Sequence, residues 1–280
     1  MVRNYFSQRV GRTPKNITFE HFKEIINIQY QKFKNDGYFQ HSFGYSCVDD
    51  PYYIDGVIKI GFAQQLILTF GEVGKYLNPE KESILNLDCY LLFDLIEFLH
   101  DYIAKPIESR HHSYSNCGIH VISASVEDGQ KEWRDELNKS LILLEPPNRF
   151  TNDGNIELLP SSEGLQDLVD KYEVPLDIEN IDSRVKHACN LFLKHGSTLN
   201  DKRDALKNLA DVFEFLRKDL KNYIPNKEER ELFNIANNFS IRHHKDTQKT
   251  QYDQESYFTW FFYSYLSTID LFSKLKKQPE

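Results

Sequence analysis

The densest group of chemically capable side chains lies near the C-terminus, where Arg242 is followed directly by His243 and His244. A guanidinium group matches the geometry of phosphate, and histidine is the side chain whose ordinary pKa lies near neutrality. Either histidine could act as general base on a 2′-hydroxyl or as general acid to the leaving oxygen. Arg242 would stabilise the charge that builds on the phosphorane. The three residues are therefore the predicted catalytic residues of an RNA-cleaving site that needs no metal.

Four polar residues around this group are the predicted substrate-binding residues. Asn238 and Asp246 each lie four residues from Arg242, so a helix would place all three on a common face. The set consists of Asn238, Lys245, Asp246 and Gln248. The alternative is structural, because an Arg-His-His run at a helix C-terminus can cap free carbonyl groups and interact favourably with the helix dipole.

A second polar group lies between residues 110 and 120 and contains His112, Cys117 and His120, which have the chemistry of zinc ligands. Their spacing of five and then three residues matches no zinc-finger or zinc-ribbon pattern. Cys47 would be a fourth ligand only if folding brought it there. The preferred interpretation is a polar loop leading into a strand, with Tyr114 and His120 hydrogen-bonded in the interior. An alternative is that this group supplies a histidine to the C-terminal site. The sequence therefore assigns no metal and no cofactor.

The first 160 residues are expected to form a mainly helical domain with a small β element. Apolar residues recur at helical spacing after Thr18, which is placed to cap a helix. Asp153-Gly154 is a turn signal between two short strand-like runs, which predicts a β-hairpin over 150–158. The expected helices are 18–35, 58–74, 84–104 and 129–144, and the expected strand is 117–126.

Beyond a linker expected at 161–182, the chain reads as nearly all helix, with helices at 183–195, 201–223, 227–241 and 254–275. Short connections between long amphipathic helices favour an antiparallel four-helix bundle. The predicted fold class is therefore mainly α, with a helical N-terminal domain at 1–160 and a bundle at 183–280.

Composition excludes several classes of protein. The 280 residues are 40% apolar and 27% charged, which is typical of globular proteins, and a net charge of −8 argues against a general nucleic-acid coat protein. No run approaches the roughly 18 apolar residues of a membrane span, and no signal peptide is recognised. The four scattered cysteines indicate free, buried thiols and a cytoplasmic protein. Signatures of P-loop, dinucleotide-binding, zinc-protease and serine-hydrolase sites are absent from the sequence.

The C-terminal segments 209–217 and 234–244 resemble the HEPN (higher eukaryotes and prokaryotes nucleotide-binding) superfamily, and in particular the HEPN-type domains of bacterial abortive-infection and toxin proteins. The resemblance covers about residues 183–277. It implies a metal-independent endoribonuclease that acts as a homodimer in anti-phage defence. Arg242 and His243 match the first two places of the family's motif.

The third place of that motif, normally a histidine, is occupied here by Thr247, Gln248 or Lys249. Either His244 replaces the missing histidine, or the site binds without cutting. The resemblance thus leaves a second expectation open, a non-catalytic subunit of a defence complex that binds a nucleotide, RNA or a protein partner. The N-terminal part would then sense, bind a partner or restrain activity.

Overall fold

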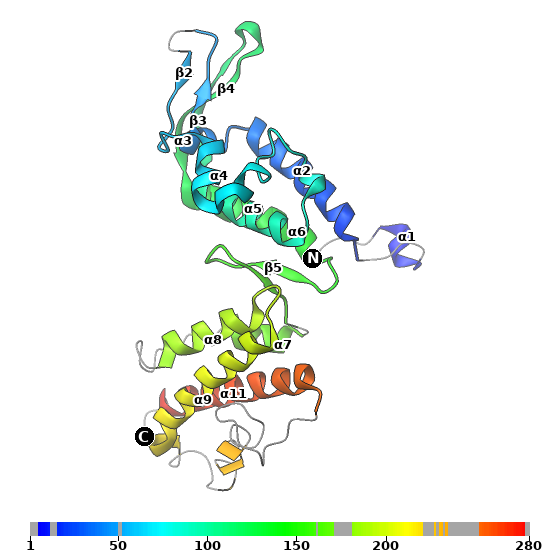
Figure 1. Cartoon of the computed structure of the whole chain (residues 1–280), viewed down its shortest axis with the longest axis vertical. Coiled ribbons are helices and arrows are strands. Elements are labelled where there is room, and N and C mark those ends of the chain that lie inside the picture. The colour runs from blue at the N-terminus through cyan, green and yellow to red at the C-terminus, as the bar shows by residue number, and fades with distance from the viewer. Residues whose placement is uncertain are drawn as a thin grey trace. The chain divides into compact units, whose positions relative to one another are not determined.

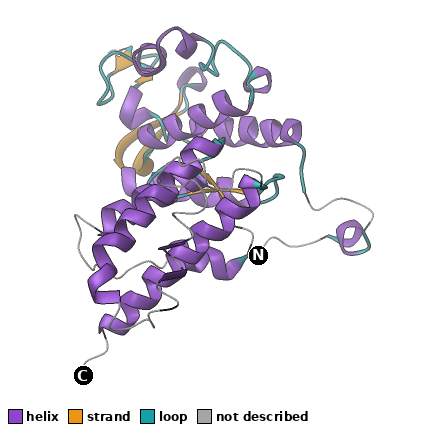
Figure 2. Ribbon diagram, turned by 60° about the horizontal axis from the view of Figure 1, so that its bottom comes forward, coloured by secondary structure: helices purple, strands orange, loops and turns teal. Residues whose placement is uncertain are grey.

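The computed structural model describes residues 5–11, 16–49, 52–160, 162–170, 181–220, 227, 230, 231, 233, 234 and 252–277. These residues are mainly helical, with short paired strands (Figures 1 and 2). The chain divides into two compact units, Met1–Ile156 and Glu157–Glu280. Among the described helices, none has the length and apolar character required to cross a membrane.

The helices of the first unit begin where short polar side chains can cap them. Helix α2 (Phe19–Asn35) starts after Thr18, whose hydroxyl accepts from the backbone N–H of His21 at 3.2 Å. Helices α5 (Cys89–Tyr102) and α6 (Val126–Leu141) are capped in the same way by Asp88 and Ser125. The remaining helical segments are α1 (Phe6–Arg9), α3 (Gln40–Phe43), α4 (Phe62–Phe70) and the 3-10 turns η1 (Gly71–Lys75) and η2 (Ile84–Asn86).

One aromatic-rich core holds the helices from α2 to α6 together. The Trp133 ring of α6 is fully buried, packs edge-on against Phe33 of α2 at 5.0 Å, and donates its N–H to the carbonyl of Ile96 at 3.3 Å. Burying large rings with a bonded polar atom is strongly stabilising. The expected helices 18–35, 84–104 and 129–144 are thus confirmed in place, with ends shifted by a few residues.

Two antiparallel hairpins project from this helical core (Figure 1). The short one pairs β1 (Tyr45–Ser46) with β2 (Tyr53–Ile54), and the long one pairs β3 (Lys105–His112) with β4 (Gly118–Ser125) through the 3-10 turn η3 (Tyr114–Asn116). Strand β4 confirms the expected strand. Residues 113–117 form the expected polar loop before it, whereas residues 110–112 belong to β3, a strand that the sequence did not predict.

Polar side chains fix the long hairpin to the helices. The amide of Gln40 donates to the carbonyl of Ile119 at 2.7 Å and accepts from the N–H of Val121 at 2.9 Å, so it pairs with the edge of β4 as a strand would. At the base, Glu132 accepts from both Tyr38 and Lys105 at 3.0 Å. Hydrogen bonds thus position the hairpin where apolar contacts are few.

The short hairpin leaves the core through a backbone-to-backbone contact. Gly44 has a φ of 76°, in the left-handed region, and a Cβ there would overlap the carbonyl of Ile54. A Cβ at Gly56 would overlap the carbonyl of Ser42. The direction of β1 and β2 is therefore set by backbone atoms that leave no space for a side chain.

A third hairpin follows helix α6 in the sequence and confirms the expected one. It consists of β5 (Asn148–Phe150) and β6 (Ile156–Leu158), and Gly154 takes a φ of 83° in its connection. Asn138 fixes β5 by two hydrogen bonds to the backbone of Phe150, at 2.7 and 3.1 Å.

After β6, the described part of the second unit is mainly helical. Its helices are α7 (Glu163–Asp170), α8 (Ser183–Leu193), α9 (Leu199–Leu220) and α11 (Gln254–Lys277). Helix α9 packs against both α8 and α11, and Phe192 stacks on Phe262 with the ring centroids 4.0 Å apart. Helix α7 lies inside the expected linker. The expected helix 227–241 lies largely outside the described residues, so the four-helix bundle stays a prediction.

We expect Gln40→Ala to lower the free energy of unfolding by about 1–3 kcal/mol, because it leaves a donor and an acceptor of β4 without partners. Denaturant unfolding of the full chain measures this change. Gln64→Ala is the matched control: its exposed side chain has no hydrogen bond to a described residue, and we expect a change within about 0.5 kcal/mol. Equal values for the two variants would contradict the anchoring role of Gln40.

Candidate metal centre

The residues predicted to cleave RNA lie outside the described residues. This applies to Arg242, His243 and His244, and equally to the predicted substrate-binding residues Asn238, Lys245, Asp246 and Gln248. Their roles stay predictions. Within the described residues, the side chains that converge on one point are instead those of the N-terminal polar group.

Four side chains with metal-binding atoms meet at the tips of the two projecting hairpins. One ligand atom from each of Cys47, His112, Cys117 and His120 lies within 4.8 Å of all the others. Cys47 comes from the β1–β2 connection, whereas the other three come from β3, β4 and the turn between them. Folding therefore brings Cys47, which the sequence offered as a fourth ligand only if folding placed it there, next to His112, Cys117 and His120.

The register of the long hairpin places its two histidines together. His112 pairs with Gly118 and His120 pairs with Arg110, so the histidines are diagonal neighbours on one face of the two-stranded ribbon. Their ring centroids are 5.2 Å apart. The two rings can approach each other because they lie on the same face of the ribbon. The sequence spacing of the two histidines does not predict this contact unless the strand register is known.

The turn between the strands brings Cys117 back over His120. Ser115 and Asn116 have φ values of 49° and 55°, a left-handed pair that reverses the chain sharply. The Sγ atom of Cys117 lies 3.2 Å from Nε2 of His120, and its thiol donates weakly to the carbonyl of Ser46 at 3.9 Å. This turn thus connects the long hairpin to the short one.

Cys47 completes the cluster from the other hairpin. Its backbone N–H donates to the carbonyl of Tyr52 at 2.9 Å, which closes the β1–β2 connection. Its Sγ atom lies 3.7 Å from Nδ1 of His112 and accepts from the backbone N–H of Asp49 at 3.4 Å. These contacts hold the sulfur of Cys47 beside His112.

The surroundings orient both imidazole rings. The carboxylate of Asp49 lies 3.3 Å from Nε2 of His112, which leaves Nδ1 facing Cys47. The Tyr45 ring packs on His120 at 4.5 Å, and Nδ1 of His120 is buried with no hydrogen-bond partner among the described residues. Burial, followed by the charges of His112 and Arg110, lowers the pKa of His120, which favours the neutral ring that metals bind.

Two thiols and two imidazoles form a donor set that suits Zn²⁺. With tetrahedral Zn–S and Zn–N bonds of ordinary length, sulfur and nitrogen atoms would stand about 3.6 Å apart. The sulfur–nitrogen distances of 3.2 and 3.7 Å bracket that value. Four protein ligands would fill a tetrahedral shell and leave no position for substrate, so the arrangement fits a structural ion rather than a catalytic one.

Several details of the sequence-based interpretation need correction. Tyr114 is 67% exposed, so it is not hydrogen-bonded in the interior as expected. His120 is buried as expected, and its Nε2 atom contacts the sulfur of Cys117. None of the four cysteines, all of which are described, forms a disulfide, yet only Cys189 is buried, and the others are half-buried. The signal that could have identified Cys47 is weak: a cysteine between two aromatic, strand-like runs.

Comparisons of the chain with protein-family models, curated proteins and solved structures find no match. The fold and the site define a mainly helical, two-unit protein with a Cys₂His₂ cluster at the tips of two hairpins in its first unit.

We expect Asp49→Asn to weaken zinc affinity by about tenfold, because a carboxylate that holds a ligating histidine contributes roughly 10- to 100-fold and this one is exposed. Competition against a chromophoric chelator measures the affinity. Asp55→Asn is the matched control, since Asp55 is also an exposed carboxylate of this region and pairs with Lys59 at 3.5 Å. An equal loss in both variants would indicate a general effect of charge instead.

Proposed function

We propose that the first unit is a zinc-binding module that holds one Zn²⁺ ion through Cys47, His112, Cys117 and His120. The observation that carries this proposal is the convergence of two thiols and two imidazoles, from two separate hairpins, within 4.8 Å. Cys47 and His112 are 65 residues apart in the sequence, so the ion would close a long loop.

The hairpins need such a cross-link because they bury little apolar surface. None of residues 105–125, all of which are described, belongs to the hydrophobic core of the first unit, and most of β3 is exposed. An isolated two-stranded hairpin is at best marginally stable in water. Metal binding supplies folding free energy in exactly such small, polar elements, because the unfolded chain has no preformed site. The proposed role of the zinc is therefore structural.

We expect the purified wild-type protein to contain one zinc ion per chain, and Cys47→Ser or Cys117→Ser to lose most of it. Elemental analysis measures the content, and Co²⁺ substitution should give the intense absorption of a tetrahedral two-thiolate site. Cys89→Ser is the matched control, because Cys89 is also a half-buried cysteine outside any disulfide but lies outside the cluster. A disulfide between Cys47 and Cys117, seen by mass spectrometry without reductant in freshly prepared protein, would contradict the proposal.

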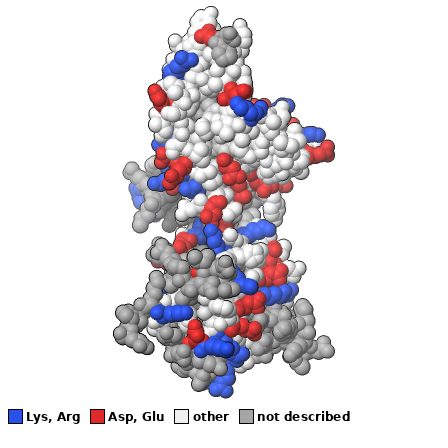
Figure 3. Space-filling model, turned by 90° about the vertical axis from the view of Figure 1, so that its left-hand side faces the viewer, with Lys and Arg blue, Asp and Glu red and all other residues white. Residues whose placement is uncertain are grey.

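For the second unit we propose RNA cleavage of the HEPN type, by a homodimer in the cytoplasm that uses Arg242, His243 and His244 without a metal. What supports this is the sequence resemblance together with long helices α8, α9 and α11 around one apolar core. On the face seen in Figure 3, basic and acidic side chains are mixed in both units, so a local site rather than net charge would attract RNA. The alternative is a non-catalytic subunit that binds a nucleotide, RNA or a protein of a defence system.

We expect R242A/H243A/H244A to reduce RNA cleavage by at least about 100-fold, the usual contribution of general acid–base groups. His187→Ala, an exposed histidine of α8, is the control and should cleave normally. The assay omits Mg²⁺ and is run with and without EDTA.

Because EDTA would also remove the proposed zinc, Cys47→Ser is assayed in parallel to separate loss of zinc from a metal requirement of cleavage. RNA binding without cleavage by the wild type would favour the non-catalytic alternative. Cleavage that all variants retain would contradict the assignment of the site.

A further inference from the structure

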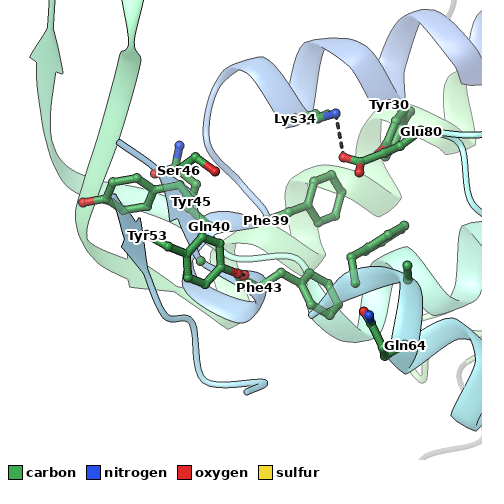
Figure 4. A pocket seen from close by; sticks show the side chains of 13 residues that line it. Tyr30, Lys34, Phe39, Gln40, Phe43, Tyr45, Ser46, Tyr53, Gln64 and Glu80 are labelled. Atoms are coloured by element: carbon green, nitrogen blue, oxygen red, sulfur yellow. Dashed lines mark hydrogen bonds and ion pairs between the residues drawn. The ribbon is translucent and has the colours of Figure 1, made fainter. Parts of the chain in front are cut away.

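The first unit contains a second site with binding chemistry, a cavity of about 490 Å³ beside the short hairpin (Figure 4). Its volume lies in the range of small-molecule sites, roughly 300–1,000 Å³. The lining comes from α2, α3, the two strands of the short hairpin, the start of α4, and Glu80 in the connection before α5. All these elements belong to the same unit, and none of the lining residues is a proposed zinc ligand.

One end of the cavity is polar and has unused hydrogen-bonding capacity. Lys34 and Glu80 form an ion pair at 2.7 Å, and Figure 4 shows Tyr30 beside them. An ammonium group has three donors and a carboxylate about four acceptor positions, so one mutual bond leaves most of their capacity free for a ligand.

Tyr30 is the most informative residue of this end. It is only 2% exposed and lines the cavity, yet its hydroxyl makes no hydrogen bond to any residue that the structure describes. The hydroxyl oxygen itself is not fully buried, so it is accessible to a ligand in the cavity. Burial, and then the Glu80 carboxylate, raise the pKa of Tyr30, so the phenol keeps its proton and can donate to a ligand.

The rest of the cavity is walled by aromatic rings in fixed positions. Phe39 and Phe43 lie between the polar end and the short hairpin, which contributes Tyr45 and Tyr53 on the opposite side (Figure 4). Tyr53 donates to the carbonyl of Phe43 at 2.5 Å, and Phe39 packs against Tyr30 at 5.9 Å. Ring faces of this kind stack well on planar heteroaromatic groups.

We propose that this cavity binds a guanine base, with its faces against the aromatic walls and its polar edge against Lys34, Glu80 and Tyr30. Guanine presents a carbonyl acceptor directly beside two adjacent N–H donor groups. The two oxygens of Glu80 match the donors, and Lys34 and Tyr30 match the carbonyl. No other common base offers this order of groups on one edge.

The charges of the site favour a base over other ligands. A phosphate group would be attracted by Lys34 but repelled by Glu80, whose Oε1 atom lies 2.7 Å from Nζ of Lys34. A purely apolar ligand would leave the ion pair and the Tyr30 hydroxyl without new partners, at a cost in desolvation. A pyrimidine would cover less of the aromatic wall than a purine does.

The test is calorimetric titration of the intact, zinc-replete protein with guanosine 5′-monophosphate, adenosine and cytidine monophosphates, and inorganic phosphate. We expect the guanine nucleotide to bind at least about tenfold more tightly than the other two, because a polar site strongly disfavours a ligand that leaves its groups unpaired. Glu80→Gln should weaken that binding at least about tenfold, and Tyr30→Phe by about fivefold, as for one lost hydrogen bond.

Glu72→Gln is the matched control and should leave the affinity unchanged, since Glu72 forms a similar exposed pair with Lys75 at 3.5 Å outside the cavity. Thermal melting verifies that each variant is folded. No binding of the guanine nucleotide at millimolar concentration would overturn the proposal. So would equal binding of all three nucleotides, binding that phosphate displaces, or an affinity that Glu80→Gln does not change.

Discussion

The meeting of two hairpin tips at Cys47, His112, Cys117 and His120 is the constraint on which the rest of the first unit's functional surface depends. Neither tip contributes a residue to the apolar core. The long hairpin is fixed instead by the amide of Gln40 along β4 and by the carboxylate of Glu132 at its base. With both ends of a polar ribbon fastened, its exposed middle can remain extended in water.

The cluster and the cavity share a structural element. Tyr45 contacts the His120 ring with one part of its surface and lines the cavity with another. Because a ring is rigid, a displacement of His120 or of the Cys47 connection would also move a wall of the cavity. The two proposals are chemically independent, since none of the four proposed zinc ligands lines the cavity, but the two sites are neighbours that share Tyr45. Order at the hairpin tips is therefore a condition for a defined cavity.

The helices could be predicted from the sequence because their signals are local. Thr18 and the apolar spacing after it predicted α2, and Leu209, Phe213 and Leu216 on one face predicted α9. Strand β3 was missed because most of its residues are exposed and its sequence lacks an apolar alternation; pairing with β4 defines it. A strand exposed on both faces leaves little trace in composition.

The metal-binding cluster could be predicted only in part, for a similar reason. His112, Cys117 and His120 lie within one hairpin and were recognisable as a group, whereas Cys47 lies 65 residues from His112 and is brought in by tertiary structure. The pairing of Lys34 with Glu80 and the free Tyr30 hydroxyl are likewise properties of the fold, and no spacing rule connects these residues. The residues of the predicted RNA-cleaving site lie outside the described part of the chain, so that prediction stands on sequence alone.

The backbone contact between Gly44 and the segment around Gly56 has a consequence for how this protein can vary. Surface residues are normally substituted freely during evolution, and even ligand-binding residues can be lost once a function is no longer selected. These two glycines have no side chain to offer to a ligand, yet any larger residue would collide with main-chain carbonyls. Among natural variants, the two positions should therefore be more uniform than the exposed aromatic residues around them, and would mark relatives whose short hairpin leaves the core in the same direction.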